Sequence, residues 1–193
     1  EYEMYHEMCL KNGWNFNLIS VSDGSSSSLK TALINFIYSR CSNDYQILLQ
    51  YVYLSEEMPS QDMLLQKSHE SDIEIKLKIE EDSLELDSNR VELTGDINTL
   101  PIRTNEKKHI LISGLGILKF QLMKKSDLQG KPTNFYFLEI DDRKTIEILE
   151  RAVMPSQAAS SPIGIILKKL LSDTKTFFLF HIDNDQENEA LLN

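Results

Sequence analysis

The chain has 193 residues, of which 41% are hydrophobic and 26% are charged, and this composition is typical of a globular domain with one well-buried core. Its formal net charge of −10 argues against a dominant nucleic-acid function, because neutralising phosphates requires basic side chains. No apolar run approaches the roughly 18 residues that a membrane helix needs. Two cysteines without a paired spacing favour the cytosol or the nucleus over secretion. The chain opens at Glu1 without Met or a signal peptide, so we expect a single domain, residues 1–193, that is a fragment of a longer protein.

The first elements along the chain are two apolar strands that flank a helix. The apolar run Phe16 to Val21 predicts a strand, and the small-residue turn after it leads into a helix from Ala32 onward. Tyr45 to Leu54 is rich in residues that favour strands, and we expect a second core strand there. Pro59 to Glu70 is then a polar connector or a short helix.

Strict alternation of apolar and charged residues begins at Ile73 and continues around a polar turn to Leu93. This period of two predicts an antiparallel β-ribbon with one buried and one wet face. The wet face carries much of the negative charge, since thirteen acidic and four basic residues lie between Glu56 and Asp96. We expect the apolar face to be covered in part by a partner chain.

The next apolar segment contains two glycines. Ile110 to Leu122 contains Gly114 and Gly116, so we expect strands broken by a bend or bulge, because a glycine in a strand marks a kink or a close approach. Lys124 to Pro132 is predicted to be a loop, and Phe135 to Ile140 an aromatic strand.

The last third of the chain predicts two helices and a strand. Arg143 to Val153 has apolar residues at helical spacing, and Pro162 opens a second helix that runs to Leu171. Thr176 to Ile182 is almost unbroken in its apolar character, which is typical of a central strand covered on both faces. Residues 183–193 form a polar tail that we expect to fray. The complete order predicts the α/β class: a single domain with a mixed β-sheet flanked by helices, and an antiparallel β-ribbon.

The turn between the first strand and helix resembles a phosphate-binding loop. Gly24, Lys30 and Thr31 stand where such a loop places its turn glycine, its phosphate-binding lysine and its magnesium-binding hydroxyl. Leu29 occupies the position of the second glycine, where a side chain should block the approach of backbone to phosphate. The resemblance implies a degenerate member of the RecA-like P-loop class, similar to the pseudo-ATPase subunits that some complexes use as scaffolds. The alternative is a serine-rich helix entry with a polar cap.

Two aspartates, Asp141 and Asp142, follow the aromatic strand and could offer a carboxylate to a divalent metal or cap the next helix. Asp142, Arg143 and Lys144 also resemble the signature of PD-(D/E)xK nucleases, and more narrowly that of the XPF family. In that family the acid would hold a metal and Lys144 would stabilise developing charge. The second acid of the signature falls on Ile148, which favours an inactive relative.

Because each of these two motifs lacks a required element, our leading hypothesis is a non-catalytic protein-interaction domain. It would act as a scaffold subunit of a cytosolic or nuclear multiprotein complex, with another protein subunit as its partner, no cofactor and no membrane contact. Nucleic acid would be reached only through the complex. The alternative is a nucleotide- or metal-dependent enzyme of the P-loop or nuclease type.

Overall fold

The computed structural model describes residues 2–22, 27–57, 60–64, 77–79, 84–95, 100, 114–140, 142–154 and 159–181. The helices in this part of the chain are α1 (Tyr2–Asn12), α2 (Ser27–Cys41), α3 (Arg143–Val153) and α4 (Pro162–Asp173). The strands are β1 (Phe16–Ser22), β2 (Tyr45–Ser55), β3 (Gln61–Asp62), β4 (Leu77–Ile79), β5 (Leu84–Leu86), β6 (Val91–Glu92), β7 (Gly114–Lys124), β8 (Thr133–Ile140) and β9 (Lys175–His181). No helix in these ranges is long and apolar enough to cross a membrane.

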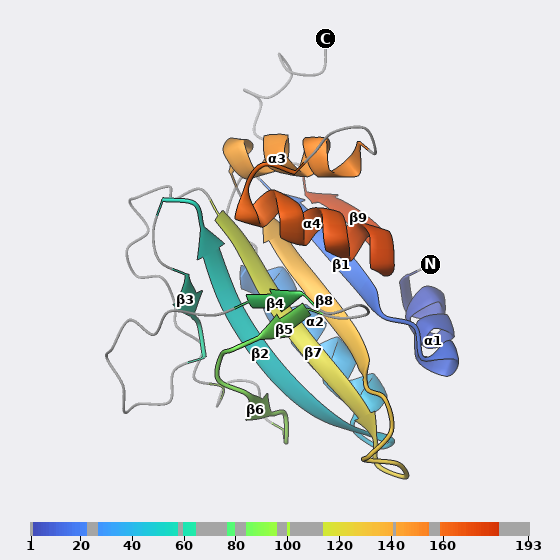
Figure 1. The fold of residues 1–193 in the computed structure, drawn as a ribbon. Helices are drawn as coiled ribbons and strands as arrows, with labels where there is room; N and C mark the ends of the chain where they lie inside the picture. The colour runs from blue at the N-terminus through green and yellow to red at the C-terminus, as the bar shows by residue number, and fades with distance from the viewer. Residues whose placement is uncertain are drawn as a thin grey trace.

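The main sheet is mixed and has the strand order β3-β2-β7-β8-β1-β9, with β6 pairing separately with β2 (Figure 1). Strand β1 runs parallel to both β8 and β9, whereas β7 runs antiparallel to β8 and to β2. The parallel pairs need crossover connections, which the helices supply. The predicted α/β class, with helices against a mixed sheet, is therefore confirmed.

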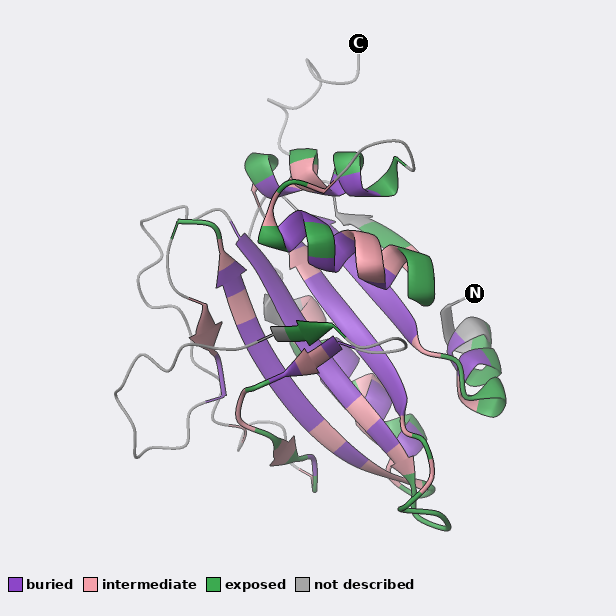
Figure 2. Ribbon diagram, viewed as in Figure 1, coloured by how far each residue is buried: buried purple, intermediate pink, exposed green. Residues whose placement is uncertain are grey.

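Each face of the sheet is buried under a different layer, and the central strands are buried along most of their length (Figure 2). One core combines α2 residues such as Leu33 and Ile37 with Phe16 and Phe135 of the sheet. The other core combines α4 residues such as Ile166 with residues of β5 and with the opposite face of the same strands. A sheet covered on both faces explains why its strands carry near-continuous apolar runs.

Helices α3 and α4 begin where the sequence places them, because each has a polar cap. The carboxylate of Asp142 accepts a hydrogen bond from the backbone N–H of Thr145, and the Ser161 hydroxyl accepts one from Gly164. Pro162 is at the first turn of α4, which costs no hydrogen bond there. Of the apolar residues at helical spacing in α3, Leu149 is buried, but Val153, the last residue of the helix, is exposed.

The final strand differs from its prediction. Among the described strands β9 pairs with β1 alone and lies at the end of the sheet order, and Phe178 and Leu179 are 40% and 39% exposed. The prediction of a central strand covered on both faces was therefore wrong. An apolar run reports a strand's composition, whereas its place in the sheet depends on pairings with distant segments.

Strand β7 continues through Gly116 to Lys124, so a break at that glycine was wrongly predicted, whereas Gly114 is the first described residue of the strand. The glycines instead permit close approach. A Cβ built on Gly114 would lie 2.5 Å from the carbonyl oxygen of Leu54, and one on Gly116 would lie 3.2 Å from the Glu139 side chain. The predicted segment 110–113 lies outside the described residues.

An antiparallel ribbon is present, but its strands pair differently from the prediction. Strands β4 and β5 pair antiparallel, while β6, which was expected to continue the ribbon, pairs with β2 of the main sheet. Leu84 and Leu86 of β5 are buried against this chain's own sheet, whereas Ile79 of β4 is 41% exposed. Residues 73–76 and the tail 183–193 lie outside the described part of the chain.

We expect Gly114→Ala to lower the free energy of unfolding by about 2 kcal/mol, because the new methyl group would lie 2.5 Å from the Leu54 carbonyl oxygen and 2.6 Å from the Tyr53 side chain. The matched control is Gly130→Ala, whose methyl group would meet mainly the end of the exposed Asp127 side chain. Urea denaturation of both variants measures the difference. Equal stability losses in the two variants would contradict close strand approach at Gly114.

Candidate functional site

The first candidate site lies where α2 begins, beside the carboxyl-terminal parts of β1 and β8. In open α/β sheets this end of the parallel strands is where ligands bind. Lys30 is in the first turns of α2, and Glu139 is the residue before the last in β8. Gly24 lies outside the described residues, and Thr31 is exposed on α2.

The ammonium group of Lys30 is held by two side chains of the sheet. Its Nζ atom lies 2.9 Å from Oε2 of Glu139 and donates a 2.6 Å hydrogen bond to Oη of Tyr51. Tyr51 in turn donates a 2.9 Å hydrogen bond to the same Glu139 oxygen. The side chains of Lys30 and Glu139 are only 16% and 12% exposed. Together Lys30, Tyr51 and Glu139 contact one another through their polar groups, and we call them the Lys30 cluster.

This cluster changes what the loop can do chemically. A phosphate-binding lysine must present its positive charge to the ligand, whereas here Glu139 already neutralises that charge. A phosphate that entered would have to break a short, largely buried ion pair and come close to a carboxylate. Leu29 packs partly buried against the core beside α2, so its side chain is part of the fold.

Sequence reasoning found Lys30 but missed Tyr51 and Glu139. Glu139 is the one charged residue within the aromatic strand Phe135 to Ile140, and it stands opposite Gly116 in the register of β7 and β8. A charge within an apolar strand, facing a glycine, is a signal that could have identified it. Tyr51 gave no comparable signal, because aromatic residues are ordinary in strands.

The second candidate site centres on Asp142, whose carboxylate has backbone partners. One oxygen accepts from Thr145 N at 2.9 Å, and the other accepts from Gly114 N at 3.0 Å. The predicted capping role is therefore confirmed, and Asp142 also ties α3 to the start of β7. Asp141 lies outside the described residues, so the metal role of these two aspartates stays a prediction. Within the described ranges no three histidine, cysteine or acidic side chains form a metal-binding group.

The side chain of Lys144 contacts Glu57, which follows the end of β2. Its Nζ atom donates a 2.8 Å hydrogen bond to Oε1 of Glu57, and this contact raises the pKa of Lys144. Both side chains are about half exposed. Glu147, the acid nearest to the position that the nuclease signature requires, is 3.7 Å from Arg143. These contacts are those of a solvated helix face.

A buried histidine connects α1 to α2. His6 is fully buried, with the edges of its ring against Phe16 and Phe36, and its Nε2 atom lies 4.0 Å from the Cys41 sulfur. Burial, and secondarily the charge of Arg40, lower the pKa of His6 from 6.5 to about 4. Burial raises the pKa of the Cys41 thiol to about 12. At neutral pH both groups are therefore uncharged.

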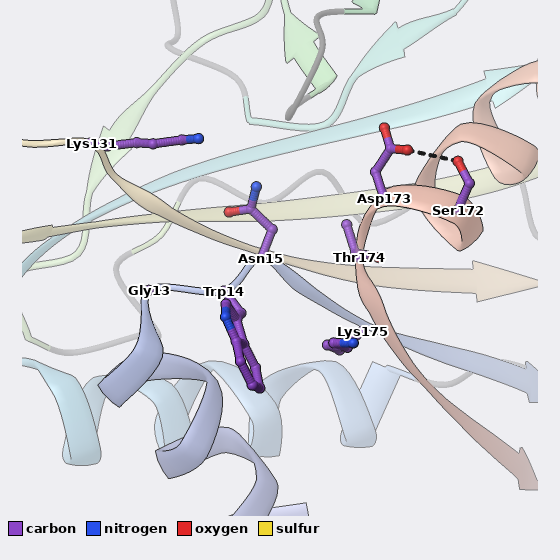
Figure 3. Close-up of a pocket in the computed structure, with 8 residues that line it drawn as sticks. All are labelled: Gly13, Trp14, Asn15, Lys131, Ser172, Asp173, Thr174 and Lys175. Carbon is purple, nitrogen blue, oxygen red and sulfur yellow. Dashed lines mark hydrogen bonds between the residues drawn. The ribbon is translucent and has the colours of Figure 1, made fainter.

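A separate pocket of about 250 Å³ lies at the other end of the sheet, where β1 and β9 begin (Figure 3). It is lined by Gly13, Trp14, Asn15, Lys131, Ser172, Asp173, Thr174 and Lys175. The Nζ atom of Lys175 lies 5.5 Å from the Trp14 ring centroid, and Ser172 donates a hydrogen bond to Asp173. We assign no ligand to this pocket.

Comparison with known proteins identifies strong similarities over the whole chain, although no protein-family model matches it. The spindle pole body-associated protein VIK1 of Saccharomyces cerevisiae is 40% identical over 202 aligned residues, which cover 100% of this chain and 31% of that protein. The solved C-terminal domain of Vik1 is 39% identical with a TM-score of 0.79, and the match covers 100% of this chain and 67% of that one. The truncated neck and C-terminal motor homology domain of ViK1 from Candida glabrata is 35% identical, again with a TM-score of 0.79. The match covers 100% of this chain and 70% of that one.

The Vik1 domain is described as having a motor domain fold without a nucleotide-binding site. A further match, 36% identical, contains the motor and motor homology domains of Kar3Vik1 fused to a synthetic heterodimeric coiled coil. The Kar3-like kinesin motor of Ashbya gossypii is only 11% identical with a TM-score of 0.62, which shows the shared fold alone. The chain therefore has a kinesin motor-domain-like fold, and it spans about a third of the length of the curated relative.

We expect Asp142→Ala to destabilise the fold by about 2 to 4 kcal/mol, because it removes a helix cap and leaves the N–H of Gly114 without its acceptor. Asp142→Asn, which keeps one oxygen acceptor, should lose less. Denaturation with and without millimolar Mn²⁺ measures both effects. A metal-dependent gain in wild-type stability that Asp142→Ala abolishes would show that the carboxylate holds a metal.

The lowered pKa of His6 predicts a loss of stability in acid. The folded state holds His6 neutral while the unfolded state takes up a proton below pH 6.5, so stability is complete above pH 6.5 and falls as the pH drops toward 4. The loss should reach about 3 kcal/mol at pH 4. Unfolding free energies measured across this range for wild type and His6→Gln test the assignment. An equally steep decline in His6→Gln would place its origin in other groups.

Proposed function

Since this chain belongs to the Vik1 family of motor homology domains, we propose that it serves as the non-catalytic subunit of a heterodimer with a Kar3-type kinesin. The fold and the family support a role as a subunit of a protein complex. The kinesin partner is carried over from the Kar3Vik1 assembly, and a spindle-associated location, cytoplasmic or nuclear, from the yeast relative.

The observation that carries the non-catalytic assignment is the Lys30 cluster. Lys30 stands where a phosphate-binding loop would present its lysine, and Glu139 and Tyr51 hold its ammonium group at 2.9 Å and 2.6 Å. Moving that group to a phosphate would leave Glu139, which is 12% exposed, without its counterion. We infer that the sequence from Gly24 to Thr31 is a degenerate phosphate-loop motif whose lysine has acquired a structural role.

The enzyme alternative has less support. For a nuclease, both oxygens of Asp142 are used by backbone N–H groups, and Lys144 pairs with Glu57. The similarity over the whole chain is to motor homology domains, which favours an ancestral nucleotide site over a nuclease site.

Equilibrium titration of the chain with a fluorescent ATP analogue and Mg²⁺ should show no saturable binding up to millimolar concentration, because the Lys30 charge is already neutralised. The wild-type chain and Glu139→Gln are compared, since the glutamine removes the negative charge and keeps a similar shape. Saturable binding by wild type that Lys30→Ala abolishes would overturn the proposal. A manganese-dependent cleavage assay on branched DNA serves as the second arm and should also be blank.

The kinesin partnership is tested separately, with the full-length gene product co-expressed with the Kar3-type kinesin of the same organism. We expect the two chains to co-purify as a one-to-one complex whose nucleotide content is one per heterodimer. Two bound nucleotides per heterodimer would contradict the non-catalytic role of this chain. Failure of the chains to co-purify would contradict the kinesin partnership.

A further inference from the structure

The ribbon of β4 and β5 lies on one face of the main sheet without joining its hydrogen-bonded ladder. Its two strands form a separate two-stranded sheet, and the buried side chains of Leu84 and Leu86 join the core that α4 also covers. The ribbon is therefore attached to the sheet by side-chain packing and by hydrogen bonds from side chains rather than by strand pairing.

Those hydrogen bonds come from a single row across the sheet. Gln50 of β2, Lys119 of β7 and Tyr136 of β8 stand opposite one another in the strand register. Gln50 donates to the Leu86 carbonyl at 2.8 Å, and Lys119 donates to the Leu84 carbonyl at 2.8 Å. The hydroxyl of Tyr136 accepts from the Leu84 N–H at 3.1 Å. Three neighbouring strands thus each supply one polar side chain to the backbone of β5.

Lys119 is the unusual member of this row because its side chain is completely buried. Its Nζ atom lies 3.2 Å from Oε1 of Glu85, and both of these acceptors, the Leu84 carbonyl and the Glu85 carboxylate, belong to β5. A buried ammonium is tolerated only when it is paired, and removing one partner of such a pair is strongly destabilising. The docked ribbon therefore supplies the charge that Lys119 needs inside the fold.

If the ribbon left the sheet, the situation of Lys119 would change. The ammonium would meet water, which solvates a lysine better than any buried site does. This gain offsets part of the cost of exposing Leu84 and Leu86, so the undocked state is closer in free energy than it would be above a purely apolar row. The pairing with Glu85 therefore contributes to holding the ribbon on the sheet.

We propose that the β4–β5 ribbon is a releasable strap, that the Lys119–Glu85 ion pair is its lock, and that the strap undocks as one unit while the main sheet stays folded. Glu85 is suited to be the exchangeable half of the lock. Its side chain is 31% exposed and also pairs with the exposed Arg90 at 3.1 Å, so groups at the surface can reach its carboxylate. Lys119 acts as a positioning residue that sets where the ribbon lies.

Hydrogen exchange followed by mass spectrometry tests the lock in the full chain. We expect Glu85→Gln to accelerate exchange in the peptide that contains residues 84–86 by tenfold or more, while peptides from β8 keep wild-type protection. The matched control is Arg90→Gln, which removes the exposed partner of the same carboxylate and should change ribbon exchange by less than threefold. Equal effects of the two variants would overturn the proposal, as would a loss of protection in β8 together with the ribbon.

A double variant separates the charge from the shape of the side chains. Lys119→Met combined with Glu85→Gln removes the whole ion pair and keeps a flexible apolar side chain under the ribbon. We expect ribbon protection in this double variant to be at least as high as in the wild type. Ribbon exchange as fast as in Glu85→Gln alone would show that Glu85 acts by packing or hydrogen bonding, and the lock would be refuted.

Discussion

The ion pair between Lys30 and Glu139 connects three elements that are far apart in the chain: the first turns of α2, the middle of β2 through Tyr51, and the end of β8. Neighbouring residues leave room for this ion pair or pack next to it. Gly116 of β7 stands opposite Glu139, and any Cβ there would come within 3.2 Å of the glutamate. Leu29 packs against the core beside the same turn. A buried charge pair holds its neighbours in place because separating it leaves each charge uncompensated.

The two faces of the sheet combine apolar packing with polar attachment in different ways. On the α2 face the Lys30 cluster links α2 to β2 and β8, and the rings of Phe16 and Phe135 stack nearer the start of their strands. On the opposite face the row of Gln50, Lys119 and Tyr136 attaches the ribbon, and α3 and α4 cover the adjoining apolar residues. Both arrangements place a lysine inside the fold with a glutamate from another element. Polar groups buried in this way specify which segment covers which part of the sheet. Apolar packing alone is less selective.

The elements that sequence patterns predicted correctly are those that local rules define. Strands β1, β2 and β8 follow from apolar and β-branched runs, α3 from helical spacing with the cap Asp142, and α4 from helical spacing with Pro162 at its start. The errors concern tertiary relations. The edge position of β9, the pairing of β6 with β2 and the continuity of β7 all depend on neighbours that are distant in the sequence. The candidate sites divide in the same way. Lys30 and Asp142 could be found from motifs, whereas Glu139, which is 88 residues from Tyr51, becomes a partner only after folding.

The chain combines a kinesin motor-domain-like fold with a lysine at the start of α2 whose ammonium group is paired with Glu139. The most direct measurement is a crystal structure of this chain in complex with its kinesin partner, grown with Mg²⁺ and a non-hydrolysable ATP analogue. We predict density for the analogue in the kinesin subunit, with Lys30 of this chain still within hydrogen-bond distance of Glu139 and Tyr51. Analogue density at the start of α2 in this chain, with the Lys30 side chain turned from Glu139 to a phosphate, would contradict the account.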